Sequence, residues 1–396
     1  MRSDTLTATQ ERADTAASGG DKIQFVDLKS QYNRLKPLID ERIHKVLDHG
    51  AYVNGPEITE LETTLAERTG ANRVIAVASG TDALLIPMMA EGIGEGDAVF
   101  LPAFTYNATA NAVIMAGAVP VFVDIDPQTF NMDPDHLEHQ IDATIAEGRL
   151  FPRAIVPVDL FGLPADYKRI LKLAEKHNLF VLADSAQSLG GALDGQNVGS
   201  LAPVTATSFF PSKTLGAYGD AGAIFSRDGD RADIWESIRW HGTDDQKKES
   251  IRIGMNGRMD SMQAAVLLSK LSIFDEELAA RRKFAAIYTE QMSSYVQTPV
   301  AQEGALSAWG LYSIVSDKRA DIQGALKAAD IPSAVYYAMP LHKHRAFAPY
   351  APKGGLPQCE AMSEKIMTLP LHPYMTEEQV MRVSDVVCSA VSKNSA

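Results

Sequence analysis

Apolar residues gather in short runs that alternate with helical patterns between about residues 70 and 230. The runs are rich in Val, Ile, Ala and Phe and do not alternate strictly with polar residues, as is typical of strands covered on both faces. The predicted strands are Arg73–Val77, Ala98–Leu101, Val119–Val123, Ala154–Val158, Phe180–Ala183, Thr205–Phe209 and Ala221–Phe225. Predicted helices between them are Thr81–Glu91, Asn107–Ala116 and Asp166–His177. This alternation predicts an α/β fold with a large, mostly parallel sheet, in which ligands bind beyond the C-terminal strand ends.

The pattern changes after about residue 250, where apolar positions recur at helical spacing. One long helix is predicted over 260–291, followed by a strand at Leu311–Val315 and helices at Ala320–Ala329 and Thr376–Val391. We therefore expect a smaller α+β domain at 251–396, after a large domain at 23–250. Helices at Leu28–Asp48 and Glu57–Thr69 precede the sheet.

Composition narrows the possible functions. Apolar residues make up 45% of the 396 positions and charged residues 22%, the proportions of an ordinary soluble globular protein. The net charge of −13 argues against a general nucleic-acid binder, which needs a basic face. Two cysteines exclude a disulfide framework or a Cys-rich metal site and favour a reducing, cytoplasmic compartment. The polar segment 1–22 is expected to be a disordered extension, and no apolar run is long enough for a membrane span.

A first candidate site joins a strand to a helix at Ala78-Ser79-Gly80-Thr81-Asp82-Ala83. Gly80 permits a close backbone approach, and the first helical N–H groups with the Thr81 hydroxyl could hold a phosphate. A helix capped by Ser79 or Thr81 explains the same residues equally well. The segment lacks the spacing of a P-loop or of G-x-G-x-x-G, which argues against nucleoside triphosphates and dinucleotides here.

A second candidate is Asp184, which ends an apolar strand in Val181-Leu-Ala-Asp-Ser-Ala-Gln187. The carboxylate could cap the next helix, or it could pair with a protonated ring nitrogen. Gln187 lies three residues later, within reach of the same pocket.

The third candidate, Lys213, lies in the turn Ser208-Phe-Phe-Pro-Ser-Lys-Thr-Leu-Gly216 after another strand. A buried lysine favours the neutral amine, and an amine of lowered pKa is what Schiff-base chemistry requires. A solvated surface lysine is the alternative. A phosphate cradle, an acid for a pyridinium nitrogen and a reactive lysine are together what a protein supplies to pyridoxal 5′-phosphate (PLP).

With Pro102-Ala-Phe-Thr-Tyr-Asn-Ala-Thr109, His241-Gly242 and Gly254-Met-Asn-Gly-Arg-Met-Asp260, these segments resemble the DegT/DnrJ/StrS nucleotide-sugar aminotransferases. The motifs S-G-T-D-A-L, D-x-A-Q, S-F-x-P-x-K and Y-G-D-x-G-A-I occur in order, and the resemblance spans roughly residues 23–390. It implies the aspartate-aminotransferase-like fold of PLP enzymes (fold type I). It also implies a homodimer whose active sites lie at the subunit interface.

The resemblance assigns roles to individual residues. Lys213 matches the lysine that forms the Schiff base and shuttles the proton, and Asp184 matches the partner of the pyridine nitrogen. Gln187 matches a contact to the cofactor ring or its O3′. Gly80, Thr81 and Ser208 match the phosphate ligands. Tyr106 matches the aromatic residue that stacks on the cofactor ring. Asn256 matches a residue that reaches the phosphate from the neighbouring subunit.

Within this family the chain looks most like enzymes that aminate C3 of a UDP-linked 3-keto-glucuronic acid sugar, for polysaccharide or other glycan biosynthesis. The resemblance places Arg258, Tyr336 and Tyr337 near the substrate, and Arg258 suits a carboxylate or a diphosphate. That branch usually has His-Tyr where this chain has Tyr336-Tyr337, so the exact sugar stays open. A UDP or dTDP carrier, a C3 or C4 ketone and glutamate as amino donor are all compatible with the sequence.

Other functions are less compatible with these residues. The family's dehydratases replace the lysine by His, whereas this chain keeps Lys213, and a non-catalytic regulatory relative would not need Lys213, Asp184 and Ser208 together. His342 and His344 form an H-x-H pair without a nearby third ligand, so no metal is expected.

Overall fold

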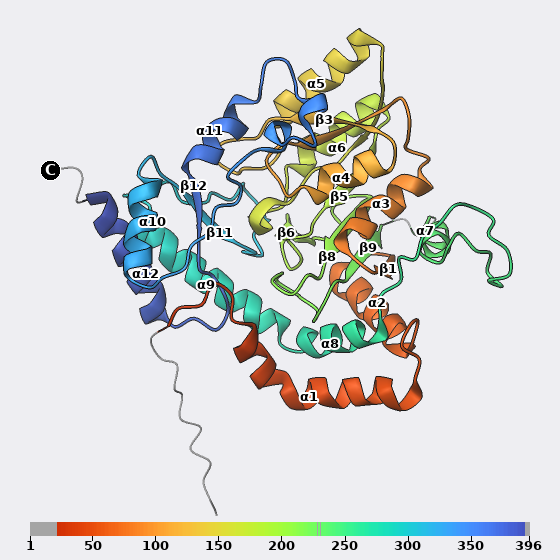
Figure 1. Cartoon of the computed structure of the whole chain (residues 1–396), viewed down its shortest axis with the longest axis horizontal. Coiled ribbons are helices and arrows are strands. Elements are labelled where there is room, and N and C mark those ends of the chain that lie inside the picture. Colours follow the sequence, from red (N-terminus) through yellow and green to blue (C-terminus); the bar gives the residue numbers. More distant parts are fainter. Residues whose placement is uncertain (1–21, 228, 230, 393–396) are drawn as a thin grey trace, which may run out of the picture.

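The computed structural model describes residues 22–227, 229 and 231–392. Its centre is a seven-stranded sheet (Figure 1) in which only one strand, β9, runs antiparallel to its neighbours. In spatial order the strands are β1 (Arg73–Val77), β9 (Gly222–Ser226), β8 (Val204–Ser208), β5 (Phe180–Asp184), β4 (Phe151–Ile155), β2 (Asp97–Pro102) and β3 (Val119–Val123). The prediction of a large, mostly parallel α/β sheet is confirmed.

Helices cover both faces of this sheet, because alternate residues of each strand point to opposite sides. One face carries α3 (Gly80–Ala90), α4 (Ala108–Met115) and α7 (Ala232–Arg239), which share a buried cluster with Val99 and Leu101 of β2. On the other face, α5 (Pro134–Glu147) and α6 (Tyr167–His177) pack on Ala98 and Phe100. Toward the β1 edge of that face, α2 (Pro56–Thr69) and α8 (Ser261–Leu271) complete the layer.

The strand predicted at Ala154–Val158 lies three residues earlier in the structure. Phe151–Ile155 forms β4, and the chain beyond it leaves the ladder at Pro157. Proline has no N–H to donate, so the ladder cannot continue through it, although Val158 still bridges to Asp184. The apolar run is therefore real, but only its first part pairs regularly.

The C-terminal part of the chain forms a separate layer of helices around a two-stranded antiparallel sheet. That sheet pairs β11 (Tyr312–Val315) with β12 (Ile366–Leu369). Residues of α9 (Phe274–Met292), α10 (Arg319–Ala328) and α12 (Glu377–Ser392) pack on it in one buried cluster. These helices gather on one side of the molecule (Figure 1). The boundary at residue 251 stays a prediction, and α8 shares its buried cluster with α2 and β9.

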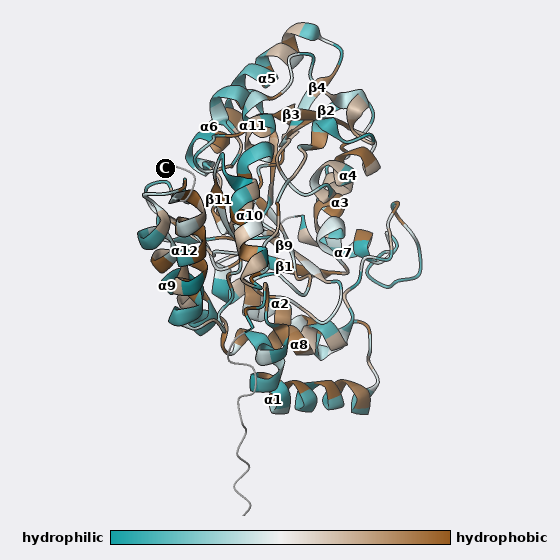
Figure 2. Cartoon of the chain, turned by 60° about the vertical axis from the view of Figure 1, so that its left-hand side comes forward, coloured by the Kyte–Doolittle hydropathy of each residue, from teal (hydrophilic) through white to brown (hydrophobic). Residues whose placement is uncertain are grey.

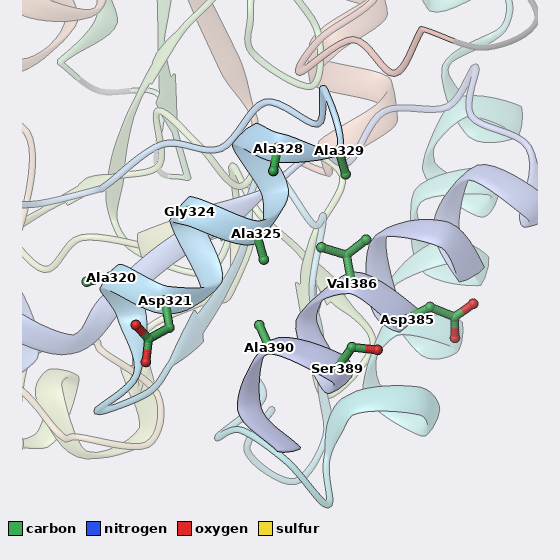
Figure 3. A pocket seen from close by; sticks show the side chains of 10 residues that line it. All are labelled: Ala320, Asp321, Gly324, Ala325, Ala328, Ala329, Asp385, Val386, Ser389 and Ala390. Atoms are coloured by element: carbon green, nitrogen blue, oxygen red, sulfur yellow. The ribbon is translucent and has the colours of Figure 1, made fainter. Parts of the chain in front are cut away.

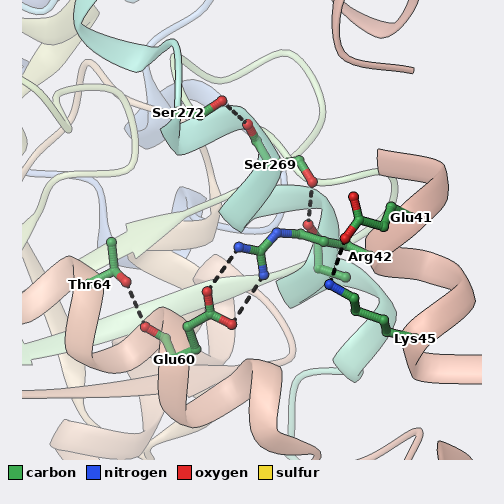
Figure 4. Close-up of polar contacts among 8 residues, drawn as sticks. Glu41, Arg42, Lys45, Glu60, Thr64, Ser269 and Ser272 are labelled. Carbon is green, nitrogen blue, oxygen red and sulfur yellow. Dashed lines mark hydrogen bonds and ion pairs between the residues drawn. The ribbon is translucent and has the colours of Figure 1, made fainter. Parts of the chain in front are cut away.

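The single helix predicted over 260–291 is wrong, because the chain bends at Ser272 and Ile273 between α8 and α9. The Ser272 hydroxyl donates to the carbonyl of Ser269 at 2.7 Å and so satisfies a group that a continuing helix would use (Figure 4). Ile273 and Phe274 then enter different buried clusters. The apolar spacing continues across the bend, which is why the pattern indicates one helix.

The remaining elements are helix α1 (Leu28–His49), which the sequence predicts at Leu28–Asp48, and shorter elements that it does not predict. The shorter ones are α11 (Pro357–Lys365), β6 (Ala192–Leu193), β7 (Gln196–Asn197), β10 (Ala305–Leu306) and the 3₁₀ turns Leu160–Gly162, Leu341–Lys343 and Ala348–Tyr350. Figure 2 shows the helices with hydrophilic residues outward and hydrophobic residues toward the interior. Arg42 of α1 pairs with Glu60 of α2 through two contacts of 2.9 and 3.1 Å (Figure 4).

Residues 1–21 of the expected N-terminal extension lie outside the described residues. In the part of the chain that the structure describes, no helix combines the length and apolar character that a membrane span requires.

Candidate active site

The predicted site residues come together where neighbouring strands of the central sheet end. Asp184 is the last residue of β5, Ser208 is the last residue of β8, and Gly80 begins α3 after β1. A methyl group added to Gly80 would lie 2.7 Å from Cβ of Ser208, so these two residues are in direct contact. Only glycine fits here, because any side chain would displace Ser208.

Asp184 is buried and accepts two hydrogen bonds. The Thr109 hydroxyl donates to Oδ2 at 2.7 Å, and the Ala186 N–H donates to Oδ1 at 3.2 Å. Burial raises the pKa of the Asp184 carboxyl, while both hydrogen bonds and the nearby positive charge of Lys213 oppose the rise. A buried carboxylate of this kind is suited to face a positive charge.

Lys213 is half-buried and close enough to Asp184 for their charges to interact. Burial lowers the pKa of its amine below the ordinary value, and the Asp184 carboxylate partly offsets this. Its backbone N–H donates to the carbonyl of Phe210 at 2.9 Å, which closes the turn. The solvated surface lysine considered from the sequence is not what forms here. An amine of lowered pKa can act as a nucleophile and as a base.

The start of α3 leaves polar groups for an anion. The Ser79 hydroxyl caps the helix by accepting from the Asp82 N–H at 3.1 Å. Gly80 and Thr81 therefore open the helix just after its cap, and first-turn N–H groups have no partner within the helix. With the Ser208 hydroxyl beside them, these groups can hold a phosphate. The cap and the phosphate cradle, posed as alternatives by the sequence, are compatible because different residues provide them.

An aromatic wall and an amide complete the pocket. Nε2 of Gln187 donates to the Tyr337 hydroxyl at 3.2 Å, and Oε1 of Gln187 accepts from the Phe161 N–H at 2.8 Å. Burial raises the pKa of Tyr337 well above its ordinary value, with further contributions from Asp184, Tyr336 and Tyr106. The Tyr336 and Tyr337 rings are 5.8 Å apart. Tyr106 is 60% exposed and so offers its ring to a ligand.

Asn256 and Arg258 lie on the segment that leads from α7 to α8, where Arg258 bridges to Val77 at the end of β1 and the Gly257 carbonyl accepts from the Ala78 N–H at 2.9 Å. Nε of Arg258 donates to Oδ1 of Asn256 at 3.0 Å, and the guanidinium lies 4.7 Å from the centre of the Trp240 ring. Within the described residues of one chain, neither side chain is hydrogen-bonded or ion-paired to Lys213 or Asp184. Their backbone thus lies beside the end of β1, while the two side chains contact each other.

Sequence reasoning missed two groups that support the site. Thr109 lies in the quoted Pro102–Thr109 segment, but its contact with Asp184 spans 75 positions and leaves no local signal. Asp159 is fully buried and accepts from the hydroxyls of Ser185, Ser188 and Tyr167 at 2.6 to 2.8 Å. Asp159 also follows an apolar strand, as Asp184 does, and that position could have flagged it.

Two further features lie outside the site. Among the described residues no cluster of three or more His, Cys, Asp or Glu side chains is placed to hold a metal ion, and the absence of a metal stays a prediction. A hollow of about 700 Å³ lies between α10 and α12 (Figure 3). Small residues form most of its lining, and its charged residues are Asp321 and Asp385. No lysine and no aromatic side chain is among the residues that line it.

Known proteins share this arrangement over nearly the whole chain. The model of the DegT/DnrJ/EryC1/StrS aminotransferase family matches residues 33–388. The chain belongs to this family. A relative from Pseudomonas aeruginosa, UDP-2-acetamido-2-deoxy-3-oxo-D-glucuronate aminotransferase, is 44% identical over 371 residues, which are 93% of this chain and 99% of the relative.

Solved structures of the family have the same fold. A DegT/DnrJ/EryC1/StrS aminotransferase from Brucella abortus has a TM-score of 0.92 and 46% identity, covering 93% of this chain and all of that one. NtdA from Bacillus subtilis, solved with bound cofactor PMP, has a TM-score of 0.86 and 30% identity, covering 94% of this chain and 85% of that one. The aminotransferase fold expected from the sequence is confirmed.

Proposed function

We propose that this aminotransferase uses PLP to place an amino group on C3 of a UDP-linked 3-keto sugar that carries a carboxylate. Glutamate is the proposed donor and leaves as its 2-oxo acid, while the sugar ketone becomes an amine. The observation that carries the proposal is the facing pair of Lys213 and Asp184 at adjacent strand ends, with Gly80 packed against Ser208 beside them.

The residues present fit PLP in each of its parts. The cradle of Gly80, Thr81 and Ser208 offers hydroxyls and N–H groups to a phosphate, and the Asp184 carboxylate offers a partner to a protonated ring nitrogen. Lys213 offers the amine that PLP enzymes need for covalent attachment. When bound, PLP supplies an electron sink for the bond-breaking steps at the donor and sugar carbons.

Each of the site residues would have its own task in that chemistry. Lys213 Nζ, with its lowered pKa, can bond to a carbonyl carbon and can later take a proton from the substrate carbon and return it. Asp184 would hold a proton on the ring nitrogen of the bound cofactor, and Thr109 keeps that carboxylate oriented. Tyr106 supplies a flat surface for stacking. Gln187, which donates to the Tyr337 hydroxyl, would contact the cofactor ring or its oxygen.

The proposed sugar follows from the P. aeruginosa relative and from the basic and aromatic residues assigned to the substrate. The relative's name specifies a 3-oxo-glucuronate, and a guanidinium such as Arg258 binds carboxylates in a bidentate way. Tyr336 and Tyr337 lie beside the pocket and are the proposed sugar contacts. Tyr336 replaces the His expected in that branch, so this position is proposed to tune the choice of sugar.

We further propose a cytoplasmic homodimer in which each chain completes the other's site. Asn256 is exposed and Arg258 is half-buried, and among the described residues neither side chain is hydrogen-bonded to Lys213 or Asp184 of its own chain. The same segment exposes two large apolar side chains, Ile253 at 85% and Ile251 at 53%. Exposed apolar residues beside exposed polar ones are typical of a surface that another protein covers.

The test is a substrate panel. The purified protein is assayed with glutamate and with UDP- and dTDP-linked 3-keto and 4-keto sugars, with and without a C6 carboxylate. The proposal expects fastest turnover with the UDP-linked 3-keto uronic acid. Faster turnover of a 4-keto sugar would contradict it. A yellow protein that glutamate does not bleach would instead favour a non-catalytic relative.

A further inference from the structure

A buried lysine that the proposed chemistry does not use lies behind the turn that carries Lys213. Nζ of Lys270, in α8, donates to the carbonyl of Gly216 at 2.5 Å. Helix α8 therefore contacts Gly216, three residues after Lys213. We propose that Lys270 is a positioning residue, whose ammonium group holds the Lys213 turn in the geometry that lets the Lys213 amine react.

A second side chain on the same helix holds the same segment. Oε1 of Gln263 accepts from the Tyr218 N–H at 2.8 Å. Gln263 and Lys270 are seven positions apart, so they lie on one face of α8, two turns from each other. Their partners, Gly216 and Tyr218, lie on either side of Ala217. The helix thus fixes the returning end of the turn at two points.

These contacts reach Lys213 because the turn is closed on itself. The Ala217 N–H donates to the Phe209 carbonyl at 2.7 Å, and the Lys213 N–H donates to the Phe210 carbonyl at 2.9 Å. A methyl group on Gly216 would overlap the backbone of Pro211, so the two limbs of the turn are in contact. A shift of Gly216 must therefore move the limb that leads to Lys213.

Burial of the Lys270 ammonium costs desolvation free energy, which a residue that only fills space would not need to lose. It is 1% exposed, and among the described residues no carboxylate forms an ion pair with it. Its ammonium instead faces the Gly216 carbonyl and the Tyr218 ring, 4.4 Å away. Burial lowers its pKa to about 8, and Glu277 of α9 opposes the shift, so at pH 7 most of the population carries the charge. Leucine or methionine could fill the same space without this desolvation cost.

Helix α8 is itself held in place by packing against neighbouring helices, so it can fix the position of the Lys213 turn. Its buried face packs with α2, and Val266 packs with Leu35 and Ile39 of α1. The Tyr32 ring of α1 lies 6.1 Å from that of Tyr218, edge to face. The inference rests on Lys213 being the reactive lysine, but the placement of the turn can be measured without turnover.

The experiment compares the wild type with Lys270→Met and Lys270→Gln, and uses Ser269→Ala as the matched control. Ser269 is buried on the same helix, and its hydroxyl donates to the Ala265 carbonyl at 2.9 Å and not to the Lys213 turn. In the PLP-free protein, amide hydrogen exchange is followed in peptides covering 209–219, 274–292 and 180–184. The reactivity of Lys213 with acetic anhydride is followed against pH in the same samples, and turnover is measured after PLP is added.

In Lys270→Met, exchange in 209–219 should be at least about tenfold faster, with the other two peptides unchanged. The pH midpoint of Lys213 acetylation should shift, and kcat should fall about tenfold with KM for the sugar unchanged. Lys270→Gln keeps a donor without the charge and should be intermediate, while Ser269→Ala should match the wild type.

Wild-type exchange and wild-type Lys213 acetylation in Lys270→Met would overturn the inference. If that variant does not fold, the same outcomes in Lys270→Gln decide. Equal acceleration in all three peptides would mean that Lys270 only stabilises the fold, which also overturns it. Faster exchange confined to 209–219 in a protein that aminates no sugar would leave the positioning role standing and reject the proposed function.

Discussion

The hydroxyl of Thr109 donates a hydrogen bond to Oδ2 of Asp184 at 2.7 Å, across 75 positions of sequence. Thr109 lies in the first turn of α4 and is buried, so its hydroxyl has no water to compete for it. The bond favours the ionised carboxylate, because a hydrogen bond to the charged form stabilises that form. Thr109, together with the Ala186 N–H and the charge of Lys213, thus opposes the rise in the pKa of Asp184 that burial causes.

Replacing Thr109 tests this relationship. Burial already raises the pKa of Asp184, and the Thr109 bond opposes the rise, so Thr109→Val should raise the pKa further. If activity requires the ionised Asp184 carboxylate, the variant should lose its activity at a higher pH than the wild type does as the solution is acidified. We expect kcat at neutral pH to fall about tenfold, the scale of one hydrogen bond to a charged group.

The measurement is the pH profile of kcat for the wild type, Thr109→Val and Thr109→Ser. Thr109→Ser keeps the hydroxyl and should keep the acid limb. If Thr109→Val has the wild-type profile, the hydroxyl does not govern the charge of Asp184.

Asp184 itself should be essential for turnover. Asp184→Asn keeps the shape and removes the charge, and we expect kcat to drop at least about a hundredfold, as when a strong electrostatic group is lost from an active site. The matched control is Asp124→Asn, another buried acid, which accepts from the Gln358 and Cys359 N–H groups at the start of α11. That variant should lose thermal stability but keep the absorbance of bound cofactor. Near wild-type turnover in Asp184→Asn would mean that the residue only supports the backbone.

The contact between Gly80 and Ser208 makes a prediction about cofactor affinity. Gly80→Ala would place a methyl group 2.7 Å from Cβ of Ser208, so one wall of the phosphate cradle must move. We expect the dissociation constant for PLP, followed by absorbance titration, to rise at least about tenfold, the loss of one hydrogen bond to a charged group.

Gly324→Ala is the control, because a methyl group there meets nothing within 4 Å and Gly324 lies inside α10. It should bind PLP as the wild type does and gain about 0.5–1 kcal/mol of stability. Unchanged affinity in Gly80→Ala would place the phosphate elsewhere.

The sequence predicts the parts of this molecule that local patterns encode. Arg73–Val77 is predicted and found as β1, since an apolar strand bounded by polar residues needs no distant information. The break between α8 and α9 was missed, because Ser272 ends α8 through a side-chain hydrogen bond that the apolar spacing does not record. Lys213, Asp184 and Ser208 were predicted as site residues because strand ends of one sheet meet in space, and their roles stay predictions. Thr109 and Lys270 were not predicted, because their partners are set by packing between distant segments.

A shared active site can be tested by mixing two inactive variants. One carries Lys213→Ala, and the other carries Asn256→Asp with Arg258→Ala. In a hybrid dimer with shared sites, one site collects both lesions and the other collects none, so part of the activity should return after dissociation and reassociation. No recovery, with hybrid formation proven by mass, would mean that one chain builds its own site.

The central claim is that Lys213 is the amine that binds PLP covalently, and borohydride reduction tests it most directly. The protein loaded with PLP is reduced, digested and mapped by mass spectrometry. The account predicts one labelled peptide, carrying the added mass on Lys213, and no label in Lys213→Ala although that variant folds. A label on any other lysine, or an unchanged label in Lys213→Ala, would contradict it.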